Sequence, residues 1–329
     1  MKMGAGTAAL GAVGSLSGCS AIRDLVPGGG GGLGKFTNWV YEPDTFESDQ
    51  ERLNNDAVSY KSMLSNKGKL NDFRRLSILG TDYPKLGIDV EDVGMELNLP
   101  EGRVITGSFD TETVKTELTA SQPSTPTAPA QNMGGSVGST EYESDGTYND
   151  YEIFVQSEPD ESPDAVALGD GTIVDARRAA NRTNDSDPVG APDVAEGIID
   201  TGTNGDDRLV DGDDTFKTLT DKLNSGARVN FELLENPVGS DDGGNENIPT
   251  SDFDGLVASG RSVSINGGTT KFQWVFVYDS EGDVNESDVN EWVEANNTGD
   301  GSLSNVNNIT VNTNSNTATV TGKQPTFEY

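Results

Sequence analysis

The side chains best suited to catalysis are scarce in this chain of 329 residues, which contains no His and a single Cys. Ser-His-Asp and Cys-His catalysis, zinc sites with His ligands, Cys-rich metal sites and an intramolecular disulfide are therefore excluded. A pair of carboxylates can hydrolyse glycosides without His. With 55 Asp and Glu residues, however, the sequence does not single out such a pair. We therefore expect that the protein is not an enzyme.

The densest group of carboxylates offers the hard oxygen ligands that Ca²⁺ prefers. Its members lie at short spacing beside glycines: Asp206, Asp207, Asp211 and Asp213. An exposed acidic loop that ends in a helix cap is the simpler interpretation, because acidic residues occur throughout the chain. We expect no cofactor, and calcium at these residues is the weaker alternative.

The only Cys ends a short motif that favours covalent attachment of a lipid. Leu16, Ser17 and Gly18 precede Cys19, and these four residues resemble the lipobox of bacterial and archaeal lipoproteins. Upstream, Lys2 is followed by an apolar stretch that is too short to span a bilayer, as in a secretory signal. The resemblance implies that residues 1–18 form a signal peptide and that Cys19 carries a lipid. A buried free Cys is the alternative.

Residues 19–35 contain Pro27 and a run of glycines, a composition typical of a flexible linker. No later stretch is long and apolar enough to cross a membrane, so the expected attachment is the lipid alone. We predict a protein tethered to the extracellular face of the cell membrane.

Five Asn-x-Ser/Thr sequences are expected to serve as glycan acceptors in an exported protein. Their asparagines are Asn181, Asn184, Asn285, Asn296 and Asn308. The tryptophans at 39, 274 and 292 suit a sugar or solute pocket, but Trp274 and Trp292 stand at core-like positions. We expect these two to pack in the core.

The formal net charge of −33 results from 55 acidic and 22 basic residues, and the acids are dispersed over the whole chain. Repulsion between them would destabilise a compact fold in dilute buffer, whereas molar salt shortens the Debye length to about 3 Å. Dispersed acids favour a halophilic protein over one that binds cations or basic partners through one acidic block. Duplex nucleic acid is disfavoured as a partner, because neutralising its phosphates requires clustered Lys and Arg, whereas the arginine pairs at 74–75 and 177–178 are isolated.

Apolar spacing predicts the first elements of the folded part. Leu53, Ala57, Tyr60 and Leu64 recur at helical intervals within residues 36–80, and Phe73, Leu76 and Leu79 continue this inner face. From residue 86 to residue 99 apolar residues alternate, which indicates strands.

Two stretches contain the element order β-α-β-β, and the first has one more strand at its end. The first runs from a strand at 103–108 through a helix capped by Asp110 to strands at 151–155, 165–168 and 172–174. The second runs from a strand at 272–278 through a helix capped near Asn285 to strands at 308–313 and 317–321. Between them, Asp213 is expected to cap a helix that precedes a strand at 228–234.

The predicted fold class is α+β, with antiparallel sheets, packed helices and two β-α-β-β-like units. We place one domain at 36–235 and the second unit at 236–329, either packed on the first domain or forming a small domain of its own. Flexible polar inserts are expected at 119–147, 181–192 and 238–250.

Segments between residues 86 and 235 resemble a family of haloarchaeal lipoproteins that has no assigned activity. The resemblance lies in residues 107–110, 150–155, 167–174 and 208–211. It implies a saline habitat, a membrane anchor and α+β architecture, and it assigns no functional residues.

Three hypotheses about function follow. The first is a non-catalytic surface lipoprotein that binds a protein or glycan partner. The second is a solute-binding lipoprotein of an importer, a class that normally has two doubly wound lobes with parallel strands. The third is an extracellular hydrolase that uses carboxylates.

Overall fold

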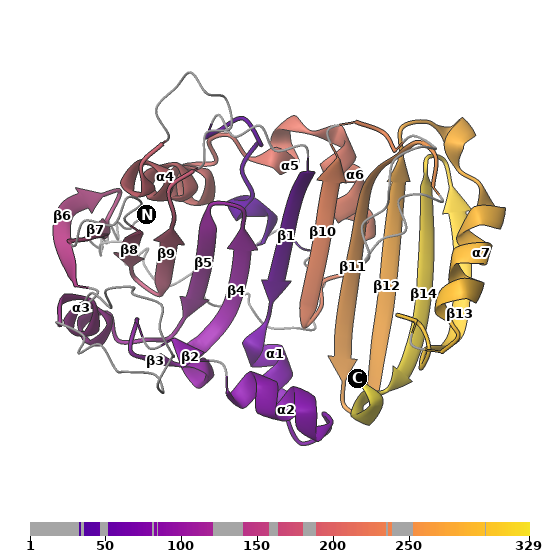
Figure 1. The fold of residues 1–329 in the computed structure, drawn as a ribbon, viewed down its shortest axis with the longest axis horizontal. Coiled ribbons are helices and arrows are strands. Elements are labelled where there is room, and N and C mark those ends of the chain that lie inside the picture. Colours follow the sequence, from indigo (N-terminus) through magenta and orange to yellow (C-terminus); the bar gives the residue numbers. More distant parts are fainter. Residues whose placement is uncertain are drawn as a thin grey trace, which may run out of the picture.

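The computed structural model describes residues 33, 36–46, 52–80, 82–83, 85–120, 141–157, 164–179, 189–234, 236–238, 253–299 and 301–329. Within these ranges the dominant feature is a single sheet of twelve strands (Figure 1). Its order is β13-β14-β12-β11-β10-β1-β4-β5-β9-β8-β7-β6, and all neighbours pair antiparallel. The expected α+β class is confirmed, and one extended sheet is its main element.

The strands of this sheet are mostly five to eleven residues long. Their bounds are β1 Arg52–Val58, β4 Val93–Leu99, β5 Gly102–Gly107, β6 Tyr142–Tyr148, β7 Tyr151–Gln156, β8 Ala165–Gly169, β9 Thr172–Ala176, β10 Arg228–Leu234, β11 Leu256–Asn266, β12 Thr269–Tyr278, β13 Asn307–Asn314 and β14 Thr317–Pro325. A separate pair consists of β2 Asp82–Tyr83 and β3 Ile88–Asp89.

Helices cover both faces of the sheet. One face, which we call the α4 face, packs against α4 Ala191–Ile199, α5 Leu209–Gly212 and α6 Asp214–Lys222. The opposite face, called the α7 face, packs against α1 Tyr60–Ser65, α2 Asp72–Leu79, α3 Thr111–Thr119 and α7 Glu286–Asn296. Shorter helical segments are η1 Thr37–Trp39, η2 Val90–Asp92, the π-helix η3 Asp200–Asn204, η5 Glu281–Asp283 and η6 Thr326–Glu328.

Alternation along the strands divides the hydrophobic core between the two faces. On β12, Val275 and Val277 join the core of the α4 face, whereas Trp274 and Phe276 join the core of the α7 face. The α4 face has one core cluster that extends across the sheet. The α7 face has two clusters, one around α7 and one around α3.

Two helices cross between parallel strands in the same manner. β12 and β13 both pair antiparallel with β14, so they are parallel to each other, and α7 lies in the connection between them. β5 and β6 are likewise parallel, separated by β9, β8 and β7, and α3 lies in their connection. Figure 1 shows α3 near one end of the sheet and α7 near the other.

The predicted helix caps are confirmed. The side chain of Asp110 accepts a hydrogen bond from the N–H of Glu112, Asp213 accepts from Phe216, and Asn285 accepts from Ser287. Each cap satisfies a backbone donor that has no partner within the helix.

The expectation of helix around Leu53 and Ala57 is wrong, because residues 52–58 form strand β1 between β10 and β4. Leu53 and Ala57 are buried in the core of the α4 face, and Asn55 between them is 1% exposed. Positions separated by two residues share one face of a strand, so these residues form an inward face that one polar side chain interrupts.

The expected inner face of the following helix is also wrong. Phe73, Leu76 and Leu79 on α2 are 76%, 66% and 41% exposed. Ile78 is the buried residue of this helix, and it packs into the core of the α7 face.

The expected inserts are shorter than predicted where the structure describes their ends. Tyr142–Tyr148 forms the edge strand β6, Thr119 ends α3, and Ala191 begins α4. The central parts of the inserts, 121–140, 180–188 and 239–252, lie outside the described residues.

One sheet joins the two predicted domains. β10 belongs to the first and β11 to the second, yet they pair from Arg228↔Val263 to Leu233↔Ala258. Within the described ranges, no helix has both the length and the apolar character needed to span a bilayer.

Candidate functional site

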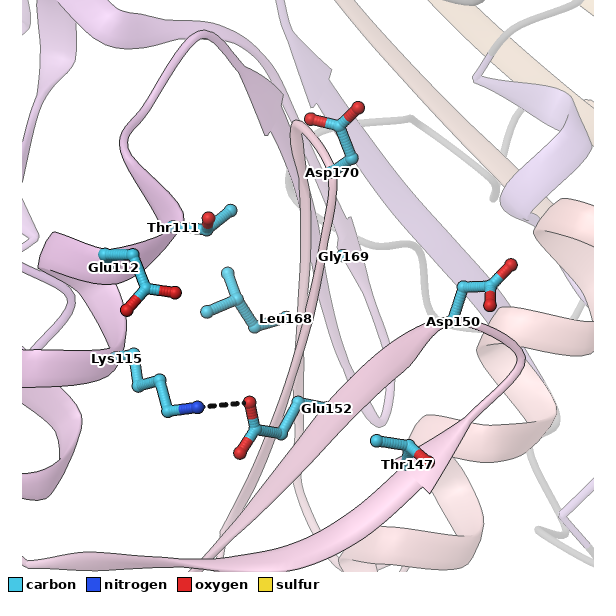
Figure 2. A pocket seen from close by; sticks show the side chains of 9 residues that line it. All are labelled: Thr111, Glu112, Lys115, Thr147, Asp150, Glu152, Leu168, Gly169 and Asp170. Atoms are coloured by element: carbon cyan, nitrogen blue, oxygen red, sulfur yellow. Dashed lines mark hydrogen bonds and ion pairs between the residues drawn. The ribbon is translucent and has the colours of Figure 1, made fainter. Parts of the chain in front are cut away.

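An open polar pocket of about 580 Å³ lies at the β6 end of the sheet (Figure 2). The first turns of α3, the β6–β7 hairpin and the β8–β9 hairpin form its walls. It is lined by Thr111, Glu112, Lys115, Thr147, Asp150, Glu152, Leu168, Gly169 and Asp170.

Local sequence determines the shape of these walls. Asn149 and Asp150 have φ values of 45° and 67°, so the two-residue β6–β7 turn has the left-handed backbone that suits the twist of a hairpin. In the β8–β9 hairpin, Gly171 takes the same role with φ of 66°. Val114 and Leu118 of α3 are buried against the sheet, which directs Glu112 and Lys115 toward the pocket.

An ion pair crosses the pocket. Lys115 Nζ of α3 lies 2.7 Å from Glu152 Oε2 of β7, and Ser144 of β6 donates to Glu152 Oε1 at 3.0 Å. Figure 2 shows the two charged side chains pointing toward one another. The bond from Lys115 lowers the pKa of Glu152, and it raises the pKa of Lys115. Both groups are therefore held in their charged forms.

These pKa shifts oppose proton transfer at the pair. A general acid at neutral pH needs a carboxyl whose pKa is raised toward the working pH, and a general base Lys needs a lowered pKa. The shifts of Glu152 and Lys115 have the opposite direction. The pair can instead hold a polar ligand, because Lys115 offers donors and Glu152 offers acceptors.

Hydrogen bonds to Asp200, the first residue of η3, hold the β6–β7 hairpin in place. Tyr148 donates to Asp200 Oδ2 at 2.5 Å, and Asn149 donates to Asp200 Oδ1 at 2.8 Å. The bond to Asp200 raises the pKa of Tyr148 to about 12, so the phenol stays protonated and remains a donor. This pocket wall is thereby positioned by a segment that follows α4.

Two of the segments singled out by the family resemblance lie at this pocket, but the sequence alone did not predict a binding site there. Residues 150–155 and 167–174, which carry part of the family resemblance, supply Asp150, Glu152 and Asp170 to the pocket lining, and residues 107–110 lead into α3 beside it. Lys115 was missed because its partner is 37 residues away in the chain.

The structure spreads the four aspartates considered for calcium over a turn and two helices. Asp206 and Asp207 lie before α5, Asp211 lies within it, and Asp213 caps α6. Burial, and then the charges of Asp44, Asp207 and Asp213, raise the pKa of Glu42. In the described part of the chain, no three His, Cys, Asp or Glu side chains form a group that could hold a metal ion.

Three of the five acceptor asparagines are described. Asn285 Nδ2 donates to Asp288, and Asn296 Nδ2 donates to the carbonyl of Trp292. Asn308, which is exposed on β13 with φ of 52°, has no such bond among the described contacts. Asn181, Asn184 and the motif Leu16 to Cys19 lie outside the described residues.

The expected packing role of two tryptophans is confirmed. Trp274 is 7% exposed and Trp292 is 4% exposed, and their rings meet edge to face at 6.0 Å. Trp39 packs partly buried against the core of the α4 face.

No protein-family model and no curated protein sequence matches the chain. Three solved structures of a protein named TP0453 resemble it. Crystal form III is 7% identical, with a TM-score of 0.45, over 89% of this chain and 94% of that chain. Crystal form IV is 8% identical with a TM-score of 0.43, over 90% and 97% of the two chains. For crystal form I the identity is 8%, the TM-score 0.42 and the coverage 87% and 94%.

Proposed function

We propose that this chain is a non-catalytic lipoprotein, anchored to the extracellular face of the cell membrane of a halophilic archaeon, that binds a partner at the cell surface. The observation that carries the proposal is Cys19, the only thiol of the chain, directly after Leu16, Ser17 and Gly18. A signal peptide at 1–18 and a glycine-rich linker at 19–35 are parts of the same proposal.

The polar pocket at the β6 end is the proposed site for the partner or ligand. Hairpin turns and the bonds to Asp200 hold its walls, so binding would not require the site to order itself first. Its charged pair favours a ligand that carries both donors and acceptors, such as a glycan or a polar peptide segment.

The architecture favours a surface-binding module over the importer receptor. A receptor of that class normally places its ligand between two doubly wound lobes with parallel strands, whereas twelve of the described strands here form one antiparallel sheet. The direction of the pKa shifts at Glu152 and Lys115 favours binding over hydrolysis at the pocket.

Glycans are proposed at the cell surface as well. Asn308 is the preferred acceptor among the described asparagines, because it is an exposed residue whose Nδ2 makes no described hydrogen bond, unlike those of Asn285 and Asn296. We further propose that the α3 and α7 crossovers are two structural versions of one β-α-β-β unit.

The anchor is tested by replacing the thiol. Cys19→Ser should move the protein from the membrane fraction to the medium, and the mass of the membrane-bound wild-type chain should include a lipid on a cleaved N-terminus. Cys19→Ser retained fully in the membrane, or an unmodified thiol in the mature wild-type chain, would remove the proposal. A Ser17→Ala variant is the matched control, since it keeps a small residue two positions before an intact Cys19 and should stay in the membrane.

A further inference from the structure

A group of exposed apolar side chains lies at the end of the molecule formed by α2 and η6. The described residues expose four large hydrophobic side chains, and all four belong to these two segments: Phe73 at 76%, Leu76 at 66%, Leu79 at 41% and Phe327 at 64%. We call these four residues the α2 patch. Exposed apolar groups gathered in one place mark an interaction site, whereas single ones are common on protein surfaces.

The two segments of the patch are held side by side. Asn71, the cap of α2, donates to the carbonyl of Tyr329 at 2.9 Å, and the guanidinium of Arg74 lies 4.9 Å from the centre of the Tyr329 ring. Leu70 and Ile78 pack into the core of the α7 face. The helix is therefore attached to the body by its inner side, while the spacing of three residues turns Phe73, Leu76 and Leu79 outward.

The charge around the patch is opposite to that of the rest of the protein. Residues 60–80 contain five basic residues, Lys61, Lys67, Lys69, Arg74 and Arg75, against one acidic residue, Asp72. The whole chain has 22 basic and 55 acidic residues. Asp72 is itself paired with Arg75 at 2.8 Å. In η6, Glu328 adds a second acidic residue beside Phe327. The α2 patch thus has a net positive border on a strongly negative molecule.

We propose that the α2 patch docks the protein onto a membrane surface with anionic head groups. A short amphipathic helix that combines aromatic and leucine side chains with Lys and Arg has the chemistry of an interfacial helix, which buries its apolar side in the boundary between head groups and acyl chains. α2 has eight residues and is about 12 Å long, so it would lie in the interface and not span the bilayer.

Molar salt favours this contact despite the net charge of −33. At a Debye length of about 3 Å the distant acidic residues no longer repel an anionic surface. Direct contacts between head groups and the lysines beside α2 lie within that range, and burial of Phe73 and Leu76 is not screened by salt.

The docking surface acts independently of a lipid on Cys19, but it is compatible with one. The fourteen residue-to-residue steps from Cys19 to Leu33 can span at most about 46–50 Å when extended. The seven residues of β1, which leads into α1 and α2, span about 23 Å. Anchor and patch can therefore contact the same membrane.

A fluorescent label can report directly on the patch. Because Cys19 is the only Cys, Cys19→Ser provides a background without thiols in which Leu76→Cys introduces a single labelling site. An environment-sensitive dye at position 76 should gain emission at least about twofold on phosphatidylglycerol vesicles in about 2 M KCl. Phosphatidylcholine vesicles should give a smaller response. The matched control carries Lys217→Cys instead, an exposed position on α6 of the α4 face, and its label should not respond.

Two further variants test which side chains are responsible. Phe73→Ser with Leu79→Ser, made in the labelled background, should weaken vesicle binding at least about tenfold, because burial of their side chains is lost. Lys67→Glu with Lys69→Glu should reduce the preference for phosphatidylglycerol. All these positions are exposed, so the fold should be retained.

Several outcomes would overturn the proposal. They are a silent label at position 76, equal responses at 76 and 217, equal responses to the two lipids, and an emission gain that depends on protein concentration without vesicles. The last result would identify a second copy of the chain as the occupant of the patch. Since every variant lacks Cys19, the result does not depend on whether the chain is lipidated.

Discussion

Helices α7 and α2 begin in the same way but use their apolar residues differently. Asn285 caps α7 by accepting from the N–H of Ser287, and Asn71 caps α2 by accepting from the N–H of Arg74. α7 buries Val289 and Trp292 against the sheet. α2 buries Ile78 and leaves Phe73, Leu76 and Leu79 exposed.

The difference shows that apolar spacing can identify a helix but does not tell whether the apolar side chains are buried against the rest of the protein. α7 connects the parallel strands β12 and β13, so its packing against these two strands follows from the crossover. α2 stands between β1 and β4, which are themselves neighbours, and a short loop would suffice there. The extra helices at this place therefore add a surface that the sheet itself does not require.

The largest expected contrast is between two truncations. Trp292 is 4% exposed and meets Phe276 at 5.3 Å, so Trp292→Ala should lower the free energy of unfolding by about 3–5 kcal/mol. Leu76→Ala should change it by no more than about 0.5 kcal/mol. Denaturant unfolding in molar salt measures both values.

Trp292→Phe is the control for the first truncation. It keeps a ring in the core and removes an indole N–H that has no hydrogen-bond partner among the described residues, so it should cost less than Trp292→Ala. A large loss of stability in Leu76→Ala would mean that Leu76 is packed against other residues. It would contradict the view that α2, unlike α7, leaves apolar side chains exposed.

The caps provide the second contrast. Asn71→Ala and Asn285→Ala should each cost about 1 kcal/mol through loss of a capping acceptor. Substitution by Ser keeps an acceptor at both positions and removes the Nδ2 donor without adding charge. Asn71→Ser should lose more stability than Asn285→Ser, because Asn71 Nδ2 donates to the carbonyl of Tyr329 in a distant segment, whereas Asn285 Nδ2 donates to Asp288 within the exposed first turn of α7. Equal stability of the two Ser variants in thermal unfolding would show that this tertiary bond contributes nothing.

The smallest expected effect on stability concerns the ion pair between Lys115 of α3 and Glu152 of β7. This pair adds to the apolar contacts that hold α3 on the sheet. The bond from Lys115 lowers the pKa of Glu152 in the folded state below the ordinary value of 4.5. Stability from this pair is therefore present above about pH 4.5 and is lost as the pH falls through the folded value. Glu152→Gln should be slightly less stable than the wild type at neutral pH, and the difference should vanish in acid.

The same pH series separates the two kinds of helix attachment. The loss caused by Trp292→Ala should not follow the titration of Glu152, since α7 packs through apolar contacts. A Glu152→Gln penalty that stays constant down to acidic pH would exclude the ion pair as its source.

Local signals in the sequence predicted many elements correctly. Asp110, Asp213 and Asn285 identified helix starts because a side-chain acceptor there satisfies a free backbone donor. The Asp170-Gly171 dipeptide likewise suits the turn between strands β8 and β9, where Gly171 has a φ of 66°. Such signals depend on residues that are close in the chain.

The errors concern properties that depend on distant partners. Leu53 and Ala57 are four residues apart, a spacing that fits both a helix and one face of a strand, and the pairing of β1 with β10 decides between them. The continuity of the sheet through β10 and β11 likewise depends on pairing across residues 235–255. For the pocket, the turns were predictable, whereas the Lys115–Glu152 contact required the packing of α3 on the sheet.

The continuous sheet also acts as a rigid spacer. Five inter-strand steps lead from β1, which precedes α2, through β4, β5, β9 and β8 to β7 of the pocket, a distance of about 24 Å. Hydrogen bonds between each pair of neighbouring strands along this path oppose bending of the sheet between β1 and β7. If α2 rests on a membrane, the pocket is therefore held at a constant offset from it, and a partner would meet its binding site at one height and in one orientation.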